Sequence, residues 1–188
     1  SRGLKVPVYC NRSTGRYIRD KDIVRDALNV FTVGAPFTIG EFTIEPFSIP
    51  HDANDPVGFA IGNGKVKIGI ATDLGYASQV VAHHLRECDI LVLESNHDVE
   101  MLLNSNRPWT VKQRIRGRNG HLSNVDSMAL LSRVLDARTR HVVLAHASEE
   151  CNCYELVRDC GVECLEKSGR SDVCLTVAQQ NGPTENLR

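Results

Sequence analysis

Three hydrophobic segments of this chain each end on a residue type that commonly binds metal ions. FSIPHD contains His51, KIGIATDLG contains Asp73, and HVVLAHASEE contains His146. A buried strand holds the residue at its end in a fixed position while one side of that residue stays open to solvent. Imidazole and carboxylate ligands suit zinc, manganese or iron, and a carboxylate can bridge two ions. We predict His51, Asp73 and His146 as metal ligands, with Asp73 central to a site for two divalent ions.

Taken singly, each of these residues is explained more simply as a strand-end histidine or as a turn residue before Gly75. The surrounding motifs favour the metal site. In chain order they are PHDANDPVGFAI, IATDLG, NGHLSN and LAHASEECN. This order resembles the metallo-β-lactamase superfamily, and most nearly its YycJ/WalJ-type branch, which is related to the tRNase Z and phosphodiesterase members.

The resemblance runs from VPVYCN to the terminal VAQQNGPTE. It implies an α/β fold, the αββα sandwich of metallo-β-lactamases, over a single domain spanning residues 1–188. It also implies a metal-dependent hydrolase that cleaves phosphodiester bonds of DNA, as a 5′-to-3′ exonuclease, with hydroxide activated by two metal ions. The alternatives are a hydrolase of the same fold acting on a small phosphodiester, and a non-catalytic binding module that has lost the metal site.

One expected motif of the superfamily, HxHxDH, does not occur in this sequence. It would lie upstream of VPVYCN, where only five residues precede Val6. His83 and His84 do not replace it, because adjacent positions on a helix point about 100° apart. We therefore expect a fold that is incomplete at its N-terminus, completed by a further segment, a second chain or a swapped homo-oligomer.

Two more residues are predicted to take part in catalysis. His121 in NGHLSN precedes a predicted helix, where it could donate a proton to a leaving group or hold a phosphoryl oxygen. In the resembled phosphodiesterases a histidine at this motif is supported by an acidic residue at the end of the preceding buried strand, which here is Glu94 in LVLESNHD. The alternative for Glu94 is a surface acid. His97 either lines the same cleft or caps the following helix.

Other residues are candidates for substrate binding. The segment KQRIRGR forms a predicted basic loop whose Arg116 and Arg118 could anchor backbone phosphates, although a solvated loop is an equal alternative. Ser123 and Asn124 begin a predicted helix, and Asn152 follows His146; each could cap a helix or contact substrate. Asp52 directly follows His51, so in a strand its side chain would face the opposite way.

Composition limits the class of protein. The chain has 188 residues, 41% of them hydrophobic, and a net charge of −1, so it has no overall attraction to nucleic acid. Its seven cysteines lack the paired spacing of a zinc ribbon, and the odd number disfavours a closed disulfide framework. No signal segment or membrane span is visible. A cytoplasmic protein with reduced thiols is the simplest interpretation.

Strands and helices alternate in the second half of the chain, as expected for a layered α/β fold. FAIGNGKVKIGIA predicts a hairpin closed by a type I′ turn at Asn63-Gly64. Helices are expected over residues 77–87, 123–134 and 149–160, and strands over 89–95, 141–146 and 171–179.

Overall fold

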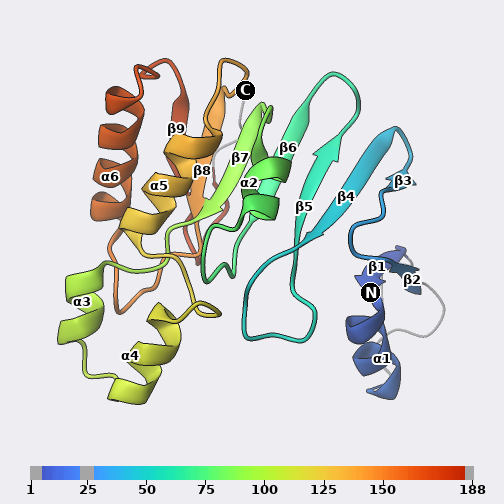
Figure 1. Ribbon diagram of the computed structural model, residues 1–188, viewed down its shortest axis with the longest axis horizontal. Coiled ribbons are helices and arrows are strands. Elements are labelled where there is room, and N and C mark those ends of the chain that lie inside the picture. Colours follow the sequence, from blue (N-terminus) through green and yellow to red (C-terminus); the bar gives the residue numbers. More distant parts are fainter. Residues whose placement is uncertain (1–5, 22–27, 185–188) are drawn as a thin grey trace.

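The computed structural model describes residues 6–21 and 28–184. Its main feature is a mixed sheet of seven strands in the order β3-β4-β5-β6-β7-β8-β9 (Figure 1). The strands are β3 (Phe37–Ile39), β4 (Phe42–Ser48), β5 (Val57–Gly62), β6 (Lys67–Ala71), β7 (Ile90–Glu94), β8 (His141–Ala145) and β9 (Cys174–Val177). Strands β3 to β6 pair antiparallel, and β6 to β9 pair parallel. The carboxyl ends of β6, β7 and β8 therefore meet at one edge, where ligands bind in open α/β sheets.

A smaller parallel sheet joins β1 (Val8–Asn11) and β2 (Leu28–Phe31). The helices are α1 (Arg12–Asp20), α2 (Gln79–Leu85), α3 (Val99–Asn104), α4 (Trp109–Arg116), α5 (Asn124–Val134) and α6 (Tyr154–Lys167). Within the described ranges, no helix is long and apolar enough to cross a membrane.

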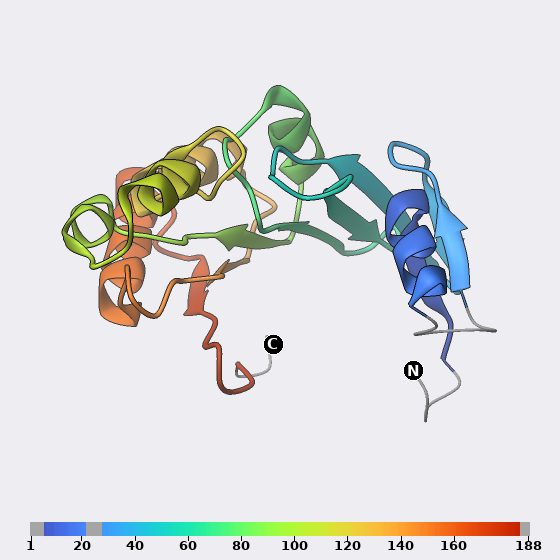
Figure 2. The ribbon, with the colours of Figure 1, turned by 90° about the horizontal axis from the view of Figure 1, so that it is seen from below.

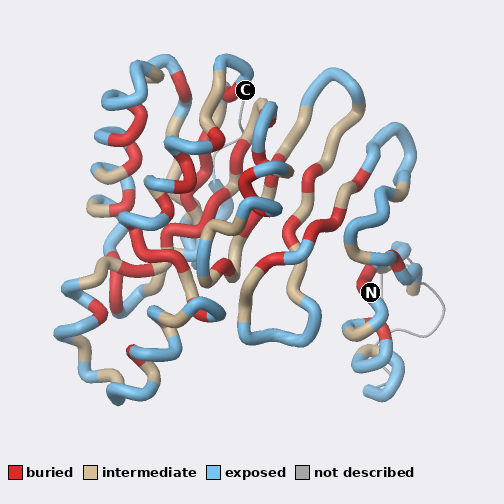
Figure 3. Tube along the Cα trace, viewed as in Figure 1, coloured by how far each residue is buried: buried red, intermediate tan, exposed pale blue. Residues whose placement is uncertain are grey.

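One face of the large sheet is covered by helices. Figure 2 shows α2 and α5 on the same side of the sheet. Along β7 the residues that face these helices, Leu91 and Leu93, are fully buried. Their neighbours Ile90 and Val92 point to the other face and are only half-buried. The buried segments in Figure 3 accordingly gather where the sheet meets the helices, and this layer fixes the ends of β6, β7 and β8.

The other face of the sheet is covered only in part. At the β3 end, Phe31 of β2 stacks on Phe37, with ring centroids 5.3 Å apart, and meets the edge of Phe59 at 5.9 Å. Further along, Ile68 and Ile70 of β6 stay half-buried. The layering of helices on a mixed sheet agrees with the predicted α/β class. Among residues 6–21 and 28–184, the second layer of the sandwich is the small β1–β2 sheet with α1.

Several local predictions need correction. The hairpin is confirmed, but the predicted turn type is wrong. Residues 63–66 form a four-residue loop in which Gly64 has a φ of +80°. The Asn63 side chain accepts the backbone N–H of Val66 at 3.0 Å, and the Asn63 N–H donates to the Val66 carbonyl at 3.2 Å, so these two bonds close the loop in place of a type I′ turn. The predicted basic loop is mostly helix α4. Helix α6 begins at Tyr154, later than expected.

The cysteines agree with the reduced state predicted from the sequence. Within the described residues all seven are free thiols, and Cys10, Cys88, Cys151 and Cys164 are buried. Burial raises the pKa of the Cys88 thiol to about 11, so this thiol stays protonated and unreactive near neutral pH.

Candidate metal centre

Asp73 and His146 lie just past the carboxyl ends of β6 and β8. Both adopt left-handed backbone conformations, with φ of 57° and 60°. This conformation is uncommon for residues other than glycine, and it concentrates at functional sites. The two side chains face each other, with the His146 Nε2 atom 3.7 Å from Asp73 Oδ1. Backbone strain at two strand ends thus brings together two of the three predicted ligands.

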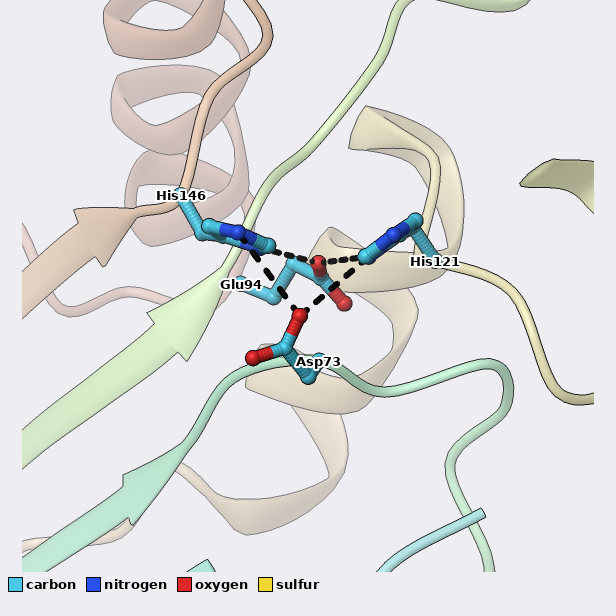
Figure 4. A group of neighbouring side chains, drawn as sticks. All are labelled: Asp73, Glu94, His121 and His146. Atoms are coloured by element: carbon cyan, nitrogen blue, oxygen red, sulfur yellow. Dashed lines mark hydrogen bonds and ion pairs between the residues drawn. The ribbon is translucent and has the colours of Figure 1, made fainter. Parts of the chain in front are cut away.

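Glu94 is the last residue of β7 and lies beneath this pair, fully buried. Its Oε1 atom accepts hydrogen bonds from the Nδ1 atoms of His121 and His146, at 2.7 and 2.8 Å (Figure 4). Its Oε2 atom accepts the backbone N–H groups of Leu74 and Leu122, at 2.8 and 3.2 Å. The predicted pairing of Glu94 with His121 is thus present in the structure, and His146 shares the same carboxylate.

These contacts fix the charge of the buried carboxylate. Burial alone would raise the pKa of Glu94, but the hydrogen bonds from His121, His146 and the Leu74 N–H outweigh it and lower the pKa. The hydrogen bond to Glu94 in turn raises the pKa of His146, with Asp73 adding to the effect and burial opposing it. Glu94 is therefore ionised near neutral pH and can only accept hydrogen bonds.

The same contacts fix the ring nitrogens that face the cleft. Because an ionised carboxylate only accepts, the Nδ1 atoms of His121 and His146 must be the donors. His51 donates from Nδ1 to the Gly120 carbonyl at 2.9 Å, since a carbonyl also only accepts. In the neutral form each of these imidazoles keeps its Nε2 lone pair free. Such anchoring is typical of histidines that bind metal ions.

The spacing of the free ligand atoms fits a divalent ion. Two ligands that each lie about 2.1 Å from a tetrahedral zinc ion are about 3.4 Å apart. His51 Nε2 lies 3.6 Å from Asp73 Oδ1, and His146 Nε2 lies 3.7 Å from the same oxygen. Asp73 Oδ1 is therefore placed to share an ion with either histidine. His121 belongs to the same group, because ligand atoms of Asp73, Glu94, His121 and His146 all lie within 4.8 Å of one another.

Two glycines allow the loops of the site to approach one another. A Cβ atom on Gly75 would lie 2.2 Å from the Arg118 carbonyl oxygen, and one on Gly120 would lie 2.1 Å from the Ile115 carbonyl oxygen. Backbone atoms occupy both places, so no larger residue fits without a shift of the chain. The segment after β6 and the segment before His121 thus pack directly together.

The expectation that the Asp52 side chain faces away from that of His51 is wrong. The chain has left β4 before His51, so the alternation of a strand no longer applies, and Asp52 Oδ1 lies 3.5 Å from His51 Nε2. The other carboxylate oxygen of Asp52 pairs with Arg114 of α4, and this hydrogen bond lowers the pKa of Asp52. Asp52 therefore faces the metal centre and ties it to α4.

A cleft of about 680 Å³ extends from this centre. Besides the residues of the centre, it is lined by Arg107 and by Arg114 of α4, and by residues 147–151 and 178–180. The two arginines carry charge into the cleft, and sequence reasoning missed Arg107. Its partner Glu150 is distant in sequence, so no local motif marks it.

The remaining predicted residues lie in two environments. Ser123 caps α5 by accepting the Asp126 N–H, and it is buried. Asn124 and Asn152 are also buried and bond to each other at 3.0 and 2.9 Å. These contacts favour positioning of the strand ends over contact with substrate.

Arg116 and Arg118 are exposed, and the guanidinium of Arg118 lies 4.4 Å from the centre of the Tyr76 ring. His97 is 2% exposed and lines the cleft. It does not cap α3, because Asp98 does so.

Comparison with known proteins agrees with this geometry. A model of the β-lactamase superfamily domain matches residues 1–147. The chain is 35% identical over 171 residues to the exodeoxyribonuclease YycJ of Bacillus anthracis, covering 90% of this chain and 65% of that protein. It is 37% identical over 128 residues to the exodeoxyribonuclease WalJ of Streptococcus pneumoniae serotype 2, covering 68% of this chain and 48% of that protein.

Solved structures share the fold at low identity. The metallo-β-lactamase fold protein YhfI of Bacillus subtilis superposes with a TM-score of 0.67 at 14% identity, covering 93% of this chain and 63% of that one. The zinc-bound protein PqqB of Methylobacterium extorquens gives a TM-score of 0.59 at 16% identity, covering 95% of this chain and 64% of that one. The chain thus spans about half to two thirds of the length of these proteins. It belongs to the β-lactamase superfamily domain family, with the metallo-β-lactamase fold and the YycJ/WalJ type of sequence.

Proposed function

We propose that this chain forms the larger part of a metal-dependent phosphodiesterase that degrades DNA from a strand end, in the 5′-to-3′ direction. The names of its relatives YycJ and WalJ, both exodeoxyribonucleases, support the substrate. The polarity rests on the family resemblance alone.

One observation carries the proposal: a buried carboxylate, Glu94, binds the Nδ1 atoms of two imidazoles beside Asp73, and the Nε2 atom of one of them, His146, lies 3.7 Å from Asp73 Oδ1. When bound, two divalent ions, zinc or manganese with iron as a further candidate, would activate water and neutralise charge on the scissile phosphate. His51, Asp73 and His146 would hold them.

His121 has a separate role in this proposal. It lies on the opposite side of Glu94 from His146, and its ring centroid is 4.9 Å from that of His51 and 5.2 Å from that of His146. We assign it as the proton donor to the leaving oxygen. Glu94 binds Nδ1 of the ring, which leaves Nε2 as the nitrogen that can carry this proton. The alternative is that His121 is itself a ligand, as its place among the ligand atoms allows.

The three assigned ligands are too few for two ions, since each ion takes at least four ligand positions and water fills only some. We propose that the other ligands come from a segment outside this sequence or from a second chain, such as another copy in a homo-oligomer. The half-buried apolar side chains on the open face of the sheet support this proposal, because such a surface favours a packing partner.

Contact with DNA would involve the exposed Arg116, the last residue of α4, and Arg118 just after it. Arginine binds phosphate through paired N–H donors. The buried Ser123, Asn124 and Asn152 would act by holding the ends of the strands that carry Glu94 and His146.

The experiment that tests the proposal is His121→Ala in the full-length protein. If His121 donates a proton, turnover of DNA should fall by roughly a hundredfold while the metal content stays unchanged. A nitrophenyl diester should lose much less, because its leaving group needs no proton. Loss of metal from the variant would make His121 a ligand.

Two outcomes for the unmodified protein would favour the alternatives. Turnover of the small diester without degradation of DNA would indicate a small-molecule hydrolase. Turnover of neither substrate in the presence of metal would indicate a binding module.

A further inference from the structure

An ion pair of the cleft lies outside the group of predicted metal ligands. Arg107, between α3 and α4, places its Nη2 atom 2.9 Å from Oε2 of Glu150, in the loop after β8. Both residues line the cleft. A phosphate that enters the cleft would therefore compete with Glu150 for Arg107.

Two buried nitrogen atoms beside this cleft have no partner. They are Nδ1 of His97 and Nε of Arg107, neither of which bonds to any residue within 6–21 and 28–184. Nearly all buried polar atoms in proteins have a hydrogen-bond partner, so each exception calls for an explanation. His97 is only 2% exposed, and both residues line the same cleft. A ligand that brings hydrogen-bonding oxygens into this cleft would supply the partners that these two atoms lack.

The backbone holds His97 in this position. Its carbonyl accepts the N–H of Asn124 at 2.9 Å, and the N–H of the next residue, Asp98, bonds to the Cys151 carbonyl at 2.9 Å. Burial lowers the pKa of His97, so its ring is neutral near pH 7 and can bond to an anion without a fixed charge. His97 is therefore a fixed hydrogen-bonding group, and Arg107 supplies the charge.

We propose that His97 and Arg107 form a subsite for the terminal phosphate of a DNA strand, with Glu150 holding Arg107 while no strand is bound. This inference rests on the proposed function and adds how a strand end is recognised. A terminal phosphate carries a charge of about −1.5 to −2 near neutral pH, more than an internal phosphodiester, and it has three free oxygens. Arginine suits such a group because its N–H donors form a planar fork.

Glu150 is placed to yield to this ligand. Its side chain is 68% exposed, and an ion pair in contact with water contributes little stability. A doubly charged phosphate in the cleft would therefore displace it from Arg107. Replacing Glu150 with glutamine should leave Arg107 free and strengthen binding of the phosphate.

The test measures binding in EDTA, so that it depends on neither metal nor hydrolysis. Labelled single-stranded oligonucleotides that differ only in a terminal phosphate or hydroxyl are titrated with the full-length protein. The unmodified protein should bind a phosphorylated end about tenfold more tightly, the effect of one charge-assisted contact. Arg107→Gln should remove that preference, and Glu150→Gln should increase it. Arg158→Gln, which removes an exposed arginine paired with Asp159 on α6, should change nothing.

Three results would overturn the subsite. The first is equal binding of the phosphorylated and the hydroxyl-ended oligonucleotide by the unmodified protein. The second is a preference for the phosphorylated end that survives in a folded Arg107→Gln variant. The third is displacement of the strand by an equal concentration of a nucleoside monophosphate. The last would make a free nucleotide the ligand. Hydrolysis of a nitrophenyl diester with manganese, measured on the same protein, tests the proposed function separately.

Discussion

Replacing Glu94 with glutamine should disrupt the metal centre while leaving its ligands in place. The carboxylate accepts four N–H donors, two from imidazoles and two from the backbone. A glutamine side chain offers one oxygen. If that oxygen stays with the fixed N–H groups of Leu74 and Leu122, the new NH₂ group faces the Nδ1 atoms of His121 and His146. At least one ring must then carry its proton on Nε2 instead of Nδ1. The Nε2 lone pair of that ring is then no longer available to a metal ion.

The size of the effect follows from the bonds that are lost. A hydrogen bond to a charged group contributes about 1.5–3 kcal/mol, and two imidazoles lose theirs while the amide restores part of the loss. We expect the free energy of unfolding of the metal-free protein to fall by about 2–4 kcal/mol. Loss of a group that orients a ligand lowers metal affinity by about 10- to 100-fold, and Glu94 orients two imidazoles, so we expect at least the upper value.

Two assays measure these effects. Urea denaturation gives the free energy of unfolding, and competition with a chromogenic chelator gives the metal affinity. Glu163→Gln is the matched control, because its carboxylate is exposed and paired with Lys167 on the surface of α6. It should leave both quantities unchanged. A folded Glu94→Gln variant that binds metal as tightly as the unmodified protein would show that Glu94 does not orient the metal-binding imidazoles.

Three further predictions concern stability and DNA binding. Because the pKa of Glu94 is lower in the folded protein than its unfolded value of 4.5, Glu94 stabilises the metal-free protein at a pH above 4.5. Because the pKa of His146 is raised above its unfolded value of 6.5, His146 stabilises the protein at a pH below 6.5. The free energy of unfolding should therefore fall as the pH rises from 6.5 through the folded pKa of His146, and His146→Gln should flatten this fall in denaturation curves. Gly75→Ala should lower the thermal midpoint, because its Cβ would meet the Arg118 carbonyl, whereas an unchanged midpoint would show that the loops can part. The double variant Arg116→Ala/Arg118→Ala should reduce the salt dependence of DNA binding by about two released counterions, and an unaltered slope would remove these arginines from the interface.

The residues at strand ends could be predicted from the sequence. His51, Asp73 and His146 each follow an apolar run, and Glu94 ends the most continuous one. Their assembly follows from a parallel arrangement, in which the ends of neighbouring strands meet at one edge. The structure pairs Glu94 with Ala145, directly before His146. That register explains why one carboxylate holds two histidines, and it could not be read from either strand alone.

Other features depend on contacts between distant residues. Asp52 and Arg114 are 62 positions apart, so the ion pair that turns Asp52 toward the metal centre leaves no trace in a local pattern. The same holds for Arg107 and Glu150, whose contact depends on the fold of two loops. The helix α4 was missed because charge dominates KQRIRGR, while Val111 and Ile115, four residues apart, supply the apolar side that faces the cleft.

Degradation of DNA by the full-length protein, with and without Asp73, tests most directly whether the metal centre cleaves DNA, because both candidate ligand pairs share this residue. An end-labelled single strand is incubated with manganese, and the products are followed with time. We expect shortening from one end that stops on addition of EDTA and is lost in a folded Asp73→Asn variant. Degradation by Asp73→Asn at the rate of the unmodified protein, or no metal-dependent degradation at all, would contradict it.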